Sequence, residues 1–97
     1  GIRNSRYELI DPKQARKYGV ETRSRIGALT FDLEVMGKFV YKWCIPNKKK
    51  IDEFIENMDC STISELEGRC VDAYIDFKKD KLIGIATRRP LYVSAAV

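Results

Sequence analysis

The feature that most constrains this fold is a pair of alternating apolar runs joined by a short turn around Gly37. Alternation with a period of two is typical of β-strands that are covered on one face. The large apolar residues of the two runs are Leu29, Phe31, Leu33, Val35, Phe39, Tyr41, Trp43 and Ile45. An antiparallel hairpin with Val35 opposite Phe39 places all of them on one face, and it places Asp32 opposite Lys42 on the outer face. A shift of one residue would scatter the apolar face, so the sequence predicts this register.

An amphipathic helix is expected directly after this hairpin. Pro46 ends the second strand, because proline cannot donate to the hydrogen-bond ladder, and Asn47 suits the N-cap of a helix. Apolar residues then recur at helical spacing; they are Ile51, Phe54, Ile55 and Met58. We therefore expect a helix over Asn47 to Met58 that covers one face of the sheet. A capping-box pattern that starts at Thr62 predicts one further helical turn, ending at Gly68.

A second hairpin is expected near the end of the chain. Residues 71–77 alternate, and residues 82–87 return after a charged turn. Gly84 indicates a bulge or a thin point in the returning strand. The sequence leaves two registers open for this hairpin. Either Ile83 and Ile85 face the core, or Leu82 and Ala86 do.

Residues 1–26 are expected to form a basic arm that belongs to the same domain as residues 27–97. The arm contains one short helix with Asp11 as N-cap, Pro12 at the first helical position and Gly19 just past the end.

These elements predict a single α+β domain with the order β-β-α-β-β and a short extra N-terminal helix. The 97 residues suit one domain. An antiparallel sheet built from the two hairpins is covered on one face by the amphipathic helix. Brief edge strands are expected around Tyr7 and Leu9 and over Leu91 to Val93.

The chain contains no histidine, and this absence excludes much familiar chemistry. Ser-His-Asp and Cys-His sites cannot be built, and the commonest metal ligand is missing. Cys44, Cys60 and Cys70 lack the spacing of zinc or thioredoxin motifs, so we interpret them as reduced thiols that pack as small hydrophobes. No glycine-rich phosphate-binding motif occurs. We expect no catalytic, metal or cofactor site; carboxylate, lysine, tyrosine or lone-thiol chemistry is kept only as a minor hypothesis.

Positive charge is concentrated at the front of the chain. The net charge is +4, and the first 25 residues hold seven basic and three acidic side chains, whereas the remainder is balanced. The seven are Arg3, Arg6, Lys13, Arg16, Lys17, Arg23 and Arg25. With Tyr7 and Tyr18 interleaved, this arm is typical of a segment that binds phosphates and stacks on bases. The alternative is a solvated segment that only raises solubility.

Two further basic clusters could extend such a surface. They are Lys48, Lys49 and Lys50 at the start of the expected helix, and Arg88 and Arg89 before Pro90. Free backbone N–H groups at a helix start also attract anions. The alternative for the lysines is local pairing with Asp52 and Glu53 one turn further on. Adjacent arginines on a strand point to opposite faces, so at most one of that pair could join a given patch.

Two functional hypotheses follow from this charge pattern. The first is a small basic module that contacts nucleic-acid phosphates and reads the backbone rather than the sequence. The alternative is a protein-interaction module, an inhibitor or adaptor of the kind that viruses and mobile elements encode, which docks on an acidic or nucleic-acid-binding protein.

No apolar run approaches the roughly 20 residues that cross a bilayer, and no leader is visible. A soluble, cytoplasmic protein without a membrane partner is expected, and a homodimer through a sheet edge is a further expectation.

Overall fold

The hairpin of β2 (Ile26–Val35) and β3 (Phe39–Ile45) has the register that the sequence predicts. The computed structural model describes residues 1–87 and 92–94. Phe31 lies opposite Trp43, and the outer pair of opposite charge is also in register. The turn between the strands contains Gly37 at a φ of 68°, a left-handed conformation that glycine adopts without steric cost.

The first strand is longer than expected. β1 (Ile2–Ile10) is a nine-residue strand, whereas the sequence predicted only a brief strand around Tyr7 and Leu9. It pairs antiparallel with β2, so that this sheet has the order β1-β2-β3. Ile2 and Ile10 at its two ends are buried. Much of the expected basic arm is therefore built into a sheet.

A bulge in β1 explains why the sequence conceals this strand. Arg3 lies opposite Asp32 and Arg6 lies opposite Thr30, so three steps along β1 match two along β2. Asn4 in the bulge has a φ of 55°, a region in which asparagine is enriched. The extra residue breaks the period of two, and it turns both arginines to the same face of the sheet.

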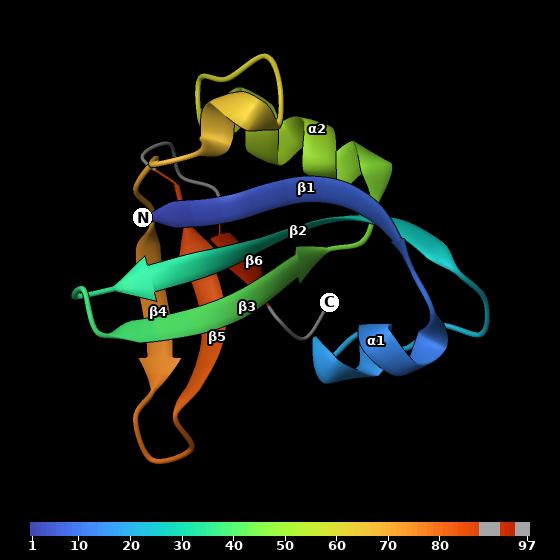
Figure 1. Cartoon of the computed structure of the whole chain (residues 1–97), viewed down its shortest axis with the longest axis horizontal. Helices are drawn as coiled ribbons and strands as arrows, with labels where there is room; N and C mark the ends of the chain where they lie inside the picture. The colour runs from blue at the N-terminus through green and yellow to red at the C-terminus, as the bar shows by residue number, and fades with distance from the viewer. Residues whose placement is uncertain (88–91, 95–97) are drawn as a thin grey trace.

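The second hairpin forms a sheet of its own, which corrects the prediction of a single sheet with the order β-β-α-β-β. β4 (Asp72–Asp76) pairs with β5 (Lys81–Ala86), and β6 (Tyr92–Ser94) pairs with β5. The observed order is β-α-β-β-α-β-β, followed by β6. Figure 1 shows β4 and β5 running across the direction of β1 to β3. The second hairpin buries its apolar residues face to face against the first sheet, instead of extending an edge of that sheet.

A bulge also decides the register of the second hairpin. Leu82 pairs with Ile75, and the pairing shifts on the following residue. Leu82 and Ile85 are therefore both buried, whereas Ile83 between them is 43% exposed. Neither predicted register is correct, because both assumed strict alternation. The bulge indicated by Gly84 is confirmed.

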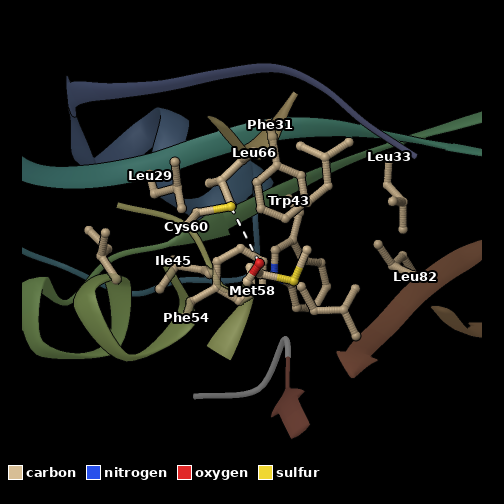
Figure 2. Packing of buried hydrophobic residues seen from close by; sticks show 13 residues of the cluster. Leu29, Phe31, Leu33, Trp43, Ile45, Phe54, Met58, Cys60, Leu66 and Leu82 are labelled. Atoms are coloured by element: carbon tan, nitrogen blue, oxygen red, sulfur yellow. Dashed lines mark hydrogen bonds between the residues drawn. The ribbon is translucent and has the colours of Figure 1, made fainter. Parts of the chain in front are cut away.

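Helix α2 (Lys48–Asn57) covers the apolar face of the first sheet, as predicted. The ring of Phe54 stacks on Phe31 with centroids 5.8 Å apart and planes 12° from parallel. Trp43 is 4% exposed and belongs to this core rather than to a surface for base stacking. Figure 2 shows these rings together with Leu82 from the second sheet. The main core therefore lies between the first sheet on one side and α2 with the second sheet on the other.

Two of the three predicted helix caps are confirmed. Asn47 Oδ1 accepts the N–H of Lys49 at 2.9 Å. Asp11 and Gln14 form a capping box in which each side chain accepts the backbone N–H of the other, at 2.7 and 3.1 Å. The box predicted at Thr62 is wrong, because the 3-10 turn Ser64–Leu66 (η1) begins without a side-chain cap.

Helix α1 (Pro12–Lys17) covers the opposite face of the first sheet. Ala15 packs with Ala28 and Cys44 in a second, smaller apolar cluster. These two strand residues alternate with the side chains that face α2, so the helices lie on opposite faces of the sheet. Figure 1 shows them well separated on either side of β1 to β3. In the part of the chain that the structure describes, no helix is long and apolar enough to span a membrane.

Candidate functional site

The two arginines of β1 each have a carboxylate partner. Arg3 Nε lies 2.9 Å from Glu34 Oε2, and Arg6 Nε lies 3.0 Å from Glu8 Oε2. Both arginine side chains are more than half exposed, so solvent weakens these ion pairs. The charges of β1 are thus partly balanced within the strand pair.

The remaining basic residues of the first 25 positions lie on α1 and on the loop that follows it. Arg16 lines a shallow hollow together with Arg23. Lys17, in the last turn of α1, lines two other hollows, and its charge there suits the negative end of the helix dipole. Lys13 and Arg25 are exposed. Of these cations, Lys17 is therefore the one that lines hollows together with residues of β1, β3 and β5.

The two hollows that Lys17 lines form one continuous surface, because Tyr18 and Lys42 also line both. We call the residues around them the Tyr18 surface. The first, the Tyr18 hollow, has a volume of about 300 Å³ and is lined by Arg6, Glu8, Gln14, Lys17, Tyr18 and Lys42. The second, of about 200 Å³, adds Tyr41, Trp43, Asp80, Lys81 and Leu82. Residues from β1, α1, β3 and β5 thus line one continuous surface, which passes around the edge strand β3.

The Tyr18 surface carries more positive than negative charge. Its basic side chains are Arg6, Lys17, Lys42 and Lys81, and its acidic side chains are Glu8 and Asp80. Within residues 1–87, none of the three lysines has a carboxylate oxygen within 4 Å. Their ammonium groups are therefore available to an anionic ligand.

Glu8, which lines the Tyr18 hollow, is held in place by two hydrogen bonds. Its Oε1 accepts from the hydroxyl of Thr30 at 3.0 Å, and its Oε2 accepts from Arg6. The bond from Arg6 lowers the pKa of Glu8 more than its partial burial raises it, so the carboxylate is ionised at neutral pH. Burial, and then the charge of Glu8, raise the pKa of Tyr18, which keeps the phenol protonated.

The far end of the surface is held by a contact between the two sheets. The hydroxyl of Tyr41 donates to Asp80 Oδ1 at 2.7 Å, and this bond raises the pKa of Tyr41. Asp80 lies in the turn between β4 and β5, so the bond connects that turn to β3. It fixes Lys81 near Lys42 along the same hollow.

The other predicted clusters do not join this surface. Lys48 and Lys49 are exposed and Lys50 is half-buried at the start of α2, which packs on the opposite face of the first sheet. Arg88 and Arg89 lie outside the described residues. The structure therefore divides the predicted basic residues between at least two faces.

Sequence reasoning missed several members of the Tyr18 surface. The charge pattern does not single out Glu8 or Gln14, pairs Lys42 only with Asp32, and places Lys81 in a turn. One signal was available: the predicted register already turns Lys42 away from the core. Recognising β1 would have added Arg6 and Glu8 to the same face, but the bulge conceals that strand.

The three cysteines differ in environment. Cys44 and Cys60 are buried and Cys70 is exposed, so the interpretation as packed hydrophobes fails for Cys70. Burial, with a smaller contribution from the charge of Glu8, raises the pKa of the Cys44 thiol to about 11. A thiol with so high a pKa is a poor nucleophile at neutral pH. The described residues contain no group of three or more His, Cys, Asp or Glu side chains placed to hold a metal ion.

The fold and the surface define a small α+β domain with a cationic face built around a tyrosine. No family model, curated protein or solved structure matches the chain. Its function is therefore argued from the chemistry of the Tyr18 surface.

Proposed function

We propose that this domain binds single-stranded nucleic acid through the Tyr18 surface. The observation that carries the proposal is the continuity of two hollows that share Lys17, Tyr18 and Lys42. Proteins that bind single strands combine cations that follow the backbone with aromatic rings that stack on bases. Lysines beside a partly exposed tyrosine supply both components.

The spread of the cations favours a chain of phosphates over a single anion. Arg6 lines only the Tyr18 hollow, Lys81 lines only the second hollow, and the shared lysines lie where the two hollows join. The cations therefore extend from β1 across α1 and β3 to β5. An extended polyanion can contact all of them at once, which increases affinity through the release of counterions.

The test is the salt dependence of binding to a labelled oligouridylate, measured by fluorescence anisotropy. We expect affinity to fall steeply between about 50 and 200 mM salt. The double variant Lys17→Gln/Lys42→Gln should bind more weakly, with a log–log salt slope shallower by about 0.7 for each lysine lost.

The matched control is Lys48→Gln/Lys49→Gln, which removes the same charge from the start of α2. It should bind like the unchanged protein, because these lysines lie on the other face of the sheet. Equal loss in the two double variants would show that net charge, rather than the Tyr18 surface, drives binding. Absence of binding at low salt would refute the proposal.

An acidic protein is the competing ligand for the same cations. If an acidic protein is the ligand, the domain should stay associated with that protein after nuclease treatment. The association should weaken in Lys17→Gln/Lys42→Gln. That result, combined with no affinity for the oligouridylate, would replace the nucleic-acid proposal.

A further inference from the structure

We propose that the Tyr18 hollow binds a guanine base of the single strand, with the carboxylate of Glu8 as the group that recognises it. This inference rests on the proposed function, and it goes beyond it because backbone binding alone gives no preference among bases.

Glu8 has acceptor capacity left for a ligand. An ionised carboxylate offers about four lone-pair positions. Thr30 takes one on Oε1 and Arg6 takes one on Oε2, so each oxygen can still accept. The side chain is 32% exposed, and it lines the hollow directly. Glu8 thus keeps unused acceptor positions on a side chain that is partly exposed at the hollow.

The position of these acceptors is well defined. Thr30 is 1% exposed in the middle of β2, so its hydroxyl is a fixed donor. Arg6 holds the second oxygen through its Nε at 3.0 Å. A carboxylate bonded on both oxygens has little freedom to rotate, which favours recognition of one ligand geometry.

Guanine is the base whose Watson–Crick edge matches a carboxylate. It presents two neighbouring donors, N1–H and the N2 amino group, whereas adenine, cytosine and uracil each present a single donor on this edge and have an acceptor where guanine has its second donor. That acceptor would face the negative charge of Glu8 and be repelled. Bases of single strands are commonly recognised on this edge while they stack on an aromatic side chain.

The rest of the hollow suits a nucleotide. Tyr18 offers an aromatic ring, while Lys17 and Lys42 lie beside it to meet the flanking phosphates. The volume of about 300 Å³ is at the lower end of the range for small-ligand sites, roughly 300–1,000 Å³. A hollow of this size can take a single base.

The first test compares short oligouridylates that differ at one central position, which is guanine, adenine, cytosine or uracil. We expect the guanine strand to bind at least about fivefold more tightly than the other three. Equal affinities would overturn the base preference and leave the proposed function standing. Failure of all four strands to bind at low salt would overturn both.

Inosine at the central position tests the contact without altering the protein. Inosine keeps N1–H but lacks the N2 amino group, so its strand should bind more weakly than the guanine strand. Equal binding of inosine and guanine would contradict a carboxylate that accepts from both donors.

The protein variants are Glu8→Gln and its matched control, Glu34→Gln. Each removes a carboxylate that pairs with an arginine of β1, but only Glu8 lines the hollow. In Glu8→Gln the guanine preference should fall to within about twofold, because the charged acceptor is lost. Glu34→Gln should keep the preference. A preference retained in Glu8→Gln would refute the assignment.

Guanosine monophosphate as a competitor distinguishes a base within a strand from a free nucleotide. We expect it to displace the guanine strand only at concentrations far above the Kd of that strand, because it offers one phosphate to the lysines. Displacement at equal concentration would assign the hollow to a mononucleotide and overturn its role in strand binding.

Discussion

Glu67 accepts two hydrogen bonds of 2.6 Å from Ser5, one from the backbone N–H and one from the hydroxyl. The residues are 62 positions apart in the chain. A third bond comes from the N–H of Asn4 at 3.2 Å. One carboxylate on the segment after η1 thus binds the donors exposed by the bulge of β1, and it holds in place the strand that carries Arg6 and Glu8.

Replacing Glu67 with glutamine is expected to lower the free energy of unfolding. The amide can retain one acceptor, but the charge that strengthens all three bonds is lost. We expect a loss of about 1 kcal/mol in urea unfolding. Glu56→Gln, at an exposed position on α2, serves as the control and should change stability by less than about 0.5 kcal/mol. Equal effects in the two variants would show that the bulge does not depend on this carboxylate.

The same contact predicts a dependence of stability on pH. Hydrogen bonds from the Ser5 hydroxyl, and then from backbone N–H groups, lower the pKa of Glu67 from its ordinary value of 4.5. The unfolded chain therefore binds a proton more readily, so the stabilisation is complete above about pH 4.5 and is lost as pH falls through the folded pKa. The stability gap between the unchanged protein and Glu67→Gln should shrink from neutral pH to about pH 3. A gap that stays constant would contradict this linkage.

The stacked pair of Phe31 and Phe54 makes α2 sensitive to truncation. Phe54 is fully buried, so Phe54→Ala should cost about 3–5 kcal/mol, a large share of the stability of a small domain. Phe77→Ala removes a ring that is 83% exposed and should cost less than about 0.5 kcal/mol. Thermal unfolding followed by circular dichroism measures both, and similar melting temperatures for the two variants would refute the packing of α2.

The bulge in β5 predicts opposite outcomes for two isoleucines that are two positions apart. Ile83→Lys places its charge in solvent and should leave the melting temperature nearly unchanged. Ile85→Lys would bury a charge at a side chain that is 0% exposed, and it should unfold or severely destabilise the domain. Urea denaturation of both variants decides between this register and one with strict alternation, which would make the two substitutions either equally harmful or equally harmless.

The elements that the sequence predicted correctly are those whose determinants are local. The alternation of apolar and polar residues predicted the pairing of Phe31 with Trp43. The caps at Asp11 and Asn47 depend on residues within one helical turn. The strand β1 was underestimated because its bulge is stabilised by Glu67, far along the chain. The registers predicted for β5 were wrong for a similar reason, because a bulge exposes Ile83 to the solvent where the pairing with β4 shifts.

The Tyr18 surface could be predicted only in small part. Arg6 and Lys17 were among the expected cations, but their convergence with Lys42 and Lys81 depends on contacts among four segments. The separation of the first sheet from the second hairpin was not predicted, and that arrangement brings the turn containing Asp80 onto β3. Charge counting could therefore find individual members of the surface but not the surface itself.

The most direct test of the central claim is a titration of isotope-labelled protein with oligouridylate at low salt, followed by amide chemical shifts. We expect saturable changes at the centre of β1, along α1, in β3 around Lys42 and at the start of β5. The amides around Lys48 at the start of α2 should not respond. Changes confined to the start of α2, or spread without saturation over all faces, would contradict a nucleic-acid site at the Tyr18 surface.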